Sequence, residues 1–136
     1  MQIKSLILFM PSIEGGGVEK NLIIISNYFA KKIKNIKLIS AENRFRNSFN
    51  KKINFISPGS KFSKNKNKIF KYLICLFLLF KEYLRNKNIL IFAFQANIYA
   101  IIFAKIFNIK IITRSNSSPS GWSKNPFKKI LFRFFL

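Results

Sequence analysis

The fold is decided by the stretch from Gln2 to Tyr28, QIKSLILFMPSIEGGGVEKNLIIISNY. Its continuous apolar segment Leu6 to Met10 is typical of a strand that is covered on both faces. From Val18 onward the apolar residues change to the spacing of one helix face. These residues are Val18, Leu22, Ile25 and Phe29. The stretch therefore predicts a buried strand, a turn and an amphipathic helix.

Three consecutive glycines, Gly15, Gly16 and Gly17, lie between this strand and this helix. Glycine allows a tight turn and leaves backbone N–H groups bare at the positive end of the helix. Such a turn is a candidate site for a phosphate or another anion. The alternative is that the glycines only shape the turn, since GGG is not the G-x-G-x-x-G dinucleotide pattern.

The rest of the chain continues the alternation of strand and helix. Further strands are predicted over 36–40, 53–56, 89–94 and 109–113, and further helices over 69–85, after 95–97 and from Pro126. This order predicts one α/β domain over residues 1–136, a Rossmann-like parallel sheet with helices on both faces. The last helix stops after about three turns without a closing strand, which we interpret as truncation.

The segment Ile69 to Arg85 is apolar on all its faces, so we expect it to be buried in the core rather than to contact a membrane. Ile89 to Phe107 is nearly long enough to span a membrane, but polar residues interrupt it. We therefore interpret it as a strand followed by a helix. Cys75 lies in an apolar run and is predicted to be an inert core thiol.

The composition excludes several kinds of active site. The chain has no His and no Asp, and its four carboxylates are Glu14, Glu19, Glu42 and Glu82. A Ser-His-Asp or Cys-His system is therefore impossible, and so is a zinc site of ordinary ligand type. The net charge of +21 predicts attraction to anionic surfaces. Because the charge is spread along the chain, without a nucleic-acid-reading motif, we do not expect a nucleic-acid partner.

Polar segments follow two other predicted strands. Gln95 and Asn97 follow the strand over 89–94, and Arg114 and Asn116 follow the strand over 109–113. In a parallel α/β sheet, ligands bind outside the carboxyl ends of the strands, where the glycine turn also lies. The alternatives are that Gln95 and Asn97 only cap a helix and that Arg114 is solvated.

The pattern resembles the N-terminal domain of a family 4 glycosyltransferase of the GT-B type. Three segments carry the resemblance: the opening strand with Pro11-Ser12 and Gly15 to Lys20, the segment Ile91 to Asn97, and the segment Ile112 to Asn116. The donor-binding domain of that family, with its paired glutamates, has no counterpart in these residues. The resemblance thus implies an incomplete GT-B fold, inactive by itself.

The resemblance also implies roles for individual residues. The donor diphosphate would lie against Gly15, Gly16 and Gly17, with Lys20 standing where family members often carry Arg. The acceptor side would be lined by Gln95, Asn97, Arg114 and Asn116. No metal ion or other cofactor is implied, and the catalytic residues stay unknown.

The function that follows is transfer of a sugar from a nucleotide-sugar donor to a lipid-linked or cell-surface glycan acceptor, in the biosynthesis of a cell-envelope glycan. The expected location is the cytoplasm, with peripheral contact to the anionic inner face of the membrane. The alternative is a non-catalytic, basic membrane-surface or interaction domain. Two helices are candidates for such a contact, Ile69 to Arg85 and Pro126 to Leu136, because each pairs apolar residues with cations. In the second, Phe127, Ile130, Leu131 and Phe134 share one face. The alternative is that the same residues pack on the sheet.

Overall fold

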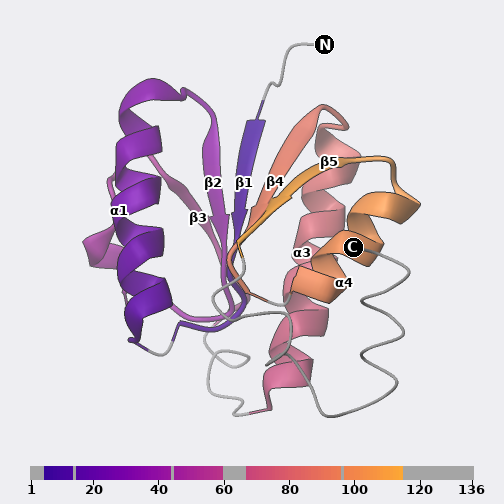
Figure 1. Ribbon diagram of the computed structural model, residues 1–136, viewed down its shortest axis with the longest axis horizontal. Coiled ribbons are helices and arrows are strands. Elements are labelled where there is room, and N and C mark those ends of the chain that lie inside the picture. The colour runs from indigo at the N-terminus through magenta and orange to yellow at the C-terminus, as the bar shows by residue number, and fades with distance from the viewer. Residues whose placement is uncertain (1–4, 14, 44, 60–66, 96, 115–136) are drawn as a thin grey trace.

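The protein is a Rossmann-like α/β domain, seen in a computed structural model that describes residues 5–13, 15–43, 45–59, 67–95 and 97–114. Five parallel strands form one sheet in the order β3-β2-β1-β4-β5 (Figure 1). The strands are β1 (Ser5–Phe9), β2 (Ile36–Ile39), β3 (Asn54–Ile56), β4 (Ile89–Ala93) and β5 (Lys110–Thr113). The helices are α1 (Gly17–Lys32), α3 (Lys68–Arg85) and α4 (Asn97–Ile106), with a 3-10 turn η1 (Arg46–Ser48). The predicted α/β fold is confirmed.

The central strand β1 is paired on both sides. Leu6 lies opposite Ile36 of β2 on one side and opposite Leu90 of β4 on the other. All five residues of β1 are buried, which explains why its sequence is apolar without alternation. The chain therefore builds the sheet outward from β1 in both directions.

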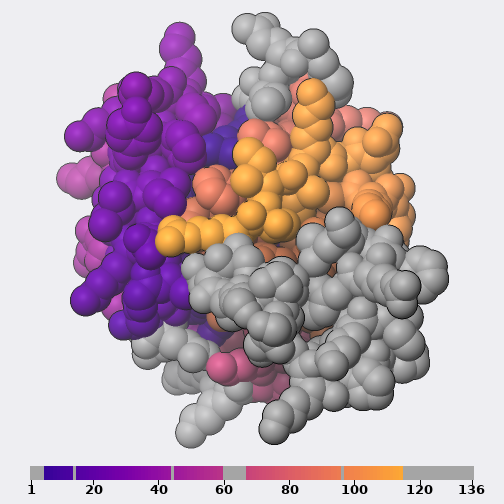
Figure 2. All heavy atoms as spheres, viewed as in Figure 1, coloured from indigo at the N-terminus to yellow at the C-terminus, as the bar shows by residue number. Residues whose placement is uncertain are grey.

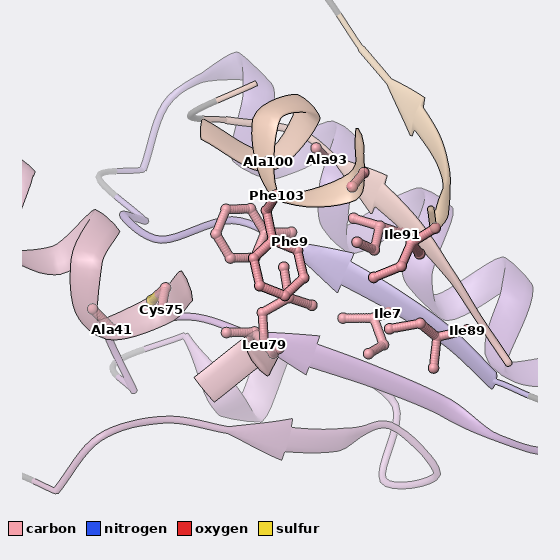
Figure 3. Close-up of a cluster of buried hydrophobic side chains, with 13 residues drawn as sticks. Ile7, Phe9, Ala41, Cys75, Leu79, Ile89, Ile91, Ala93, Ala100 and Phe103 are labelled. Atoms are coloured by element: carbon pink, nitrogen blue, oxygen red, sulfur yellow. The ribbon is translucent and has the colours of Figure 1, made fainter. Parts of the chain in front are cut away.

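Helices cover the two faces of the sheet separately. On one face, α1 packs over β1 and β2, and its side chains share a core with Leu8, Leu38 and Phe94. On the other face, α3 and α4 enclose a second core in which Phe9 of β1 meets Leu79 of α3 and Phe103 of α4 (Figure 3). Ala100 and Ala104 of α4 are buried in this core, where their small side chains let the helix lie close to the sheet.

Beside α1, the sheet is only partly covered. Side chains of β4 and β5 reach the surface next to α1 in the space-filling view (Figure 2). Leu90 and Phe92 of β4 are half-buried, and Ile112 of β5 is exposed.

The prediction that α3 is buried on all sides is wrong. Its buried face carries Lys71, Cys75, Leu79 and Glu82. The opposite face leaves Ile69, Leu73, Phe77 and Leu84 exposed. A helix that lies on the outside of a three-layer domain can bury only one face, whatever its composition.

Two ion pairs fix α3 across β2. Near its start, Lys71 Nζ lies 2.6 Å from Glu42 Oε1, just beyond the carboxyl end of β2. Near its end, Glu82 Oε2 lies 2.5 Å from Lys37 Nζ on β2, and Arg85 binds the other oxygen of Glu82. In the first pair the helix supplies the cation, and in the second it supplies the carboxylate. A helix that ran the other way would therefore place like charges next to each other. The two ion pairs thus fix the direction of α3.

The segment Ile89 to Phe107 forms β4 and α4, as interpreted from its sequence. Among the helices of the described ranges, none is both long and apolar enough to cross a bilayer. The predicted helix from Pro126 lies outside the described residues.

Cys75 is fully buried in the core between the sheet and α3, which confirms its interpretation as a core thiol. Burial raises the pKa of the thiol from 9.0 to about 12, although nearby Lys71 opposes the shift. The fraction of thiolate near neutral pH falls roughly a thousandfold as a result.

We predict that iodoacetamide modifies Cys75 very slowly in the folded protein at about pH 8 and rapidly after denaturation. Mass spectrometry after timed labelling measures both rates. The free energy of unfolding should also fall from about pH 9 to about pH 12, because only the unfolded chain releases the thiol proton there. In Cys75→Ala, the free energy of unfolding should fall less over this pH range, because the thiol is absent. Equal labelling rates in both states would contradict the burial of this thiol.

Candidate functional site at the carboxyl edge of the sheet

The carboxyl edge of the sheet brings together the segments that the sequence singled out. The order β3-β2-β1-β4-β5 reverses direction between β1 and β4. The loop after β1 leads into α1 on one face of the sheet, and the loop after β4 leads into α4 on the other face. This reversal is the topological switch point at which open α/β sheets bind ligands.

The glycine turn joins β1 to α1 at this edge. Gly15 has a φ of +94°, which side chains rarely tolerate. Gly16 is the N-cap of α1, with extended backbone and no side-chain cap. Gly17 is the first residue of the helix, and a Cβ added to it would meet no other atom within 4 Å. Lys20 is exposed in the same first turn. The three glycines are exposed and lie at the positive end of α1.

A carboxylate already lies against the turn. Glu19, in the first turn of α1, is buried, and its Oε2 lies 3.0 Å from the position of a Cβ added to Gly16. Negative charge is favourable at a helix N-terminus, so the helix dipole accounts for this placement. An anionic ligand that approached the turn would meet this carboxylate.

The polar residues on the other side of the switch point make structural contacts. Gln95 Oε1 accepts the backbone N–H of Ser12 at 2.9 Å, which ties the loop after β4 to the loop after β1. Asn97 Nδ2 donates to the carbonyl oxygen of Arg114 at 2.9 Å, across the ends of β4 and β5. Arg114 is half-buried, and Asn116 lies outside the described residues.

Asn97 has one unusual feature. Its Oδ1 is buried and has no hydrogen-bond partner within the described part of the chain. An unpaired buried acceptor is costly, so this position favours a donor such as a ligand hydroxyl. The sequence predicted the residue but not the buried, unpaired oxygen.

Sequence reasoning missed a buried polar network at the same edge. Glu42 Oε1 accepts hydrogen bonds from Lys71 Nζ at 2.6 Å and from Ser12 Oγ at 3.3 Å. The Glu42 backbone N–H donates to Ser40 Oγ at 3.2 Å. Because Ser12 also binds Gln95, the network runs from α3 past β2 and β1 to β4. It fixes helix α3 and the loops after β1, β2 and β4 relative to one another at the carboxyl edge.

One signal in the sequence could have indicated this network. Lys71 is four residues before Cys75 and eight before Leu79, so it lies on the same helix face as two core residues. A lysine at such a position needs a buried carboxylate, and Glu42 lies three residues beyond the end of β2, the strand next to α3.

A groove of about 380 Å³ lies elsewhere, between α4 and β5. It is lined by Ile101, Ala104, Lys105, Asn108, Ile109, Ile111 and Thr113, none of which the sequence predicted as a site residue.

The glycine turn gives a matched pair of substitutions. Gly15→Ala should lower the free energy of unfolding by about 1–2 kcal/mol, because a side chain at φ +94° is strained. Gly17→Ala should raise it by about 0.5 kcal/mol, because the site is helical and open. Urea unfolding measures both. Equal effects of the two changes would contradict the described turn.

The buried ion pair gives a second prediction. Lys71→Met leaves Glu42 buried without its cation and should destabilise the fold by about 3–5 kcal/mol. Lys81→Met, on the exposed face of the same helix, should cost less than about 0.5 kcal/mol. The double variant Lys71→Met with Glu42→Gln should be more stable than Lys71→Met alone, because it no longer buries an unpaired negative charge. A cost for Lys71→Met no larger than that for Lys81→Met would show that the pair does not stabilise the fold.

Comparisons with known proteins give no match to a family model, a curated protein or a solved structure. The sheet order and the packing of helices on both faces place the chain among Rossmann-like α/β folds. The glycosyltransferase resemblance depends on the sequence segments that carry it, and its consequences are therefore proposals about a Rossmann-like domain.

Proposed function

We propose that this domain is the acceptor-side half of a glycosyltransferase. It would help to move a sugar from a nucleotide-sugar donor to a lipid-linked or cell-surface glycan acceptor. The observation that supports the proposal best is the position of the exposed glycine turn, directly after the central strand and beside the switch point. In the family that the motifs resemble, this turn lies against the donor diphosphate.

The chemistry of the turn suits a diphosphate. A leaving nucleoside diphosphate carries negative charge, which backbone N–H groups and the dipole of α1 stabilise. Lys20 adds an exposed cation in the first turn of the same helix. We expect the transfer to need no metal ion, since these groups would stabilise the charge that develops on the diphosphate.

On the other side of the switch point, Asn97 and Arg114 are candidates for contact with the acceptor. Asn97 offers an unpaired oxygen to a sugar hydroxyl, and Arg114 lies at the end of the adjacent strand. Gln95 is the weaker candidate, because its oxygen already accepts the N–H of Ser12. The domain by itself is expected to bind but not to transfer, since the family forms its active site between two domains.

Glu19 allows a direct test of the proposal. Its carboxylate lies at the turn, where it repels a diphosphate, so Glu19→Gln should increase the affinity for uridine diphosphate about two- to fivefold. Lys20→Gln should decrease that affinity, whereas Lys31→Gln, at the far end of α1, should leave it unchanged. Isothermal titration calorimetry measures all four proteins.

Two outcomes would count against the proposal. The first is affinity for uridine diphosphate that neither Glu19→Gln nor Lys20→Gln changes. The second is equal affinity for uridine and uridine diphosphate, which would mean that the domain does not recognise the phosphates.

A further inference from the structure

A stripe of large apolar side chains runs along the outer face of α3. Its four members are Ile69 (60% exposed), Leu73 (58%), Phe77 (56%) and Leu84 (59%). At about 100° per residue they fall within about 80° of arc, and at 1.5 Å per residue they extend over about 22 Å. Single exposed apolar residues are ordinary, but a continuous stripe marks an interaction surface. We call these four residues the α3 stripe.

The charges around the α3 stripe have one sign. Lys81 Nζ lies 4.7 Å from the centre of the Phe77 ring, and Lys87 is exposed just beyond the end of the helix. The three glutamates of the described ranges, Glu19, Glu42 and Glu82, are all buried. Every exposed charged side chain in those ranges is therefore a lysine or an arginine. A partner that covers the stripe has to tolerate, or complement, this positive charge.

Charge complementarity selects one kind of partner. A second copy of the chain would bring lysine against lysine, which repels. Nucleic acid is anionic, but proteins bind its bases on aromatic platforms, whereas three of the four stripe residues are aliphatic. An anionic lipid surface offers negative headgroups for the lysines and an apolar zone below them for the stripe.

We propose that the α3 stripe docks this protein on the surface of an anionic membrane. Ile69, Leu73, Phe77 and Leu84 enter the boundary between headgroups and acyl chains, and Lys81 and Lys87 contact the headgroups. The buried face of α3 stays in the core, so docking needs no unfolding. The inference holds whether or not the domain transfers a sugar.

The test is flotation with vesicles of phosphatidylcholine and phosphatidylglycerol, compared with vesicles of phosphatidylcholine alone. The wild-type protein should bind the anionic vesicles, less at high salt, and should bind the neutral ones at most weakly. Leu73→Gln with Phe77→Gln should reduce binding about tenfold or more. Ile24→Gln with Tyr28→Gln is the matched control, an equally spaced and equally exposed pair on α1, and should change binding less than about twofold.

A second comparison isolates the charge. Lys81→Gln with Lys87→Gln should weaken binding about fivefold per cation. Lys31→Gln with Lys34→Gln removes the same net charge from the end of α1 and should weaken binding less. Circular dichroism checks that each variant is folded, which is expected because all eight positions are exposed.

Several results would overturn the proposal. Equal losses for the α3 and α1 pairs would mean that overall charge, not the stripe, drives binding. Equal binding to both vesicle types would show that the protein does not recognise the negative charge of the lipid headgroups. No vesicle binding, together with a dimer in sedimentation that Leu73→Gln with Phe77→Gln dissolves, would identify the stripe as a contact between copies. Binding of RNA without binding of vesicles would identify nucleic acid instead.

Discussion

The structure depends on one constraint, the burial of β1 between two parallel neighbours. Each of its five residues is buried, and its backbone pairs with β2 on one side and with β4 on the other. The strand therefore separates the two cores. Because all its neighbours in the sheet are parallel, the loops that lead into α1, α3 and α4 all begin at the carboxyl edge. This arrangement places the glycine turn, the loop after β4 and the start of α3 at the same edge. The candidate site is a consequence of how β1 is buried.

The few carboxylates of the chain are used inside the fold. Glu42, after β2, pairs with a lysine of α3, and Glu82 of α3 pairs with a lysine of β2. These two ion pairs hold α3 against β2. Glu19 lies at the N-terminus of α1. The burial of these three glutamates leaves only cations among the exposed charges of the described ranges. The exterior is thus basic because the glutamates are buried where they hold the helices. A basic exterior favours an anionic partner. A nucleoside diphosphate at the turn and a lipid surface along α3 would meet this exterior at different places.

Much of the fold could be predicted from the sequence, because buried parallel strands carry continuous apolar runs and helices carry a different period. The expected strand over 89–94 is observed as Ile89–Ala93, and the expected helix over 69–85 as Lys68–Arg85. The face that α3 buries could not be predicted, because apolar residues surround the helix and give no preferred side. The ion pair of Lys71 with Glu42 was missed because it joins residues 29 positions apart through tertiary packing. Gln95 and Asn97 were predicted at the correct edge, but their hydrogen bonds to Ser12 and Arg114 need coordinates.

The central functional claim is that the carboxyl edge at the switch point receives the nucleotide. Amide hydrogen exchange with and without uridine diphosphate tests it most directly. The account predicts slower exchange in peptides that cover the glycine turn and the loop after β4, with no change along the outer face of α3. Slower exchange confined to the groove between α4 and β5, or no change at the glycine turn under saturating nucleotide, would contradict it.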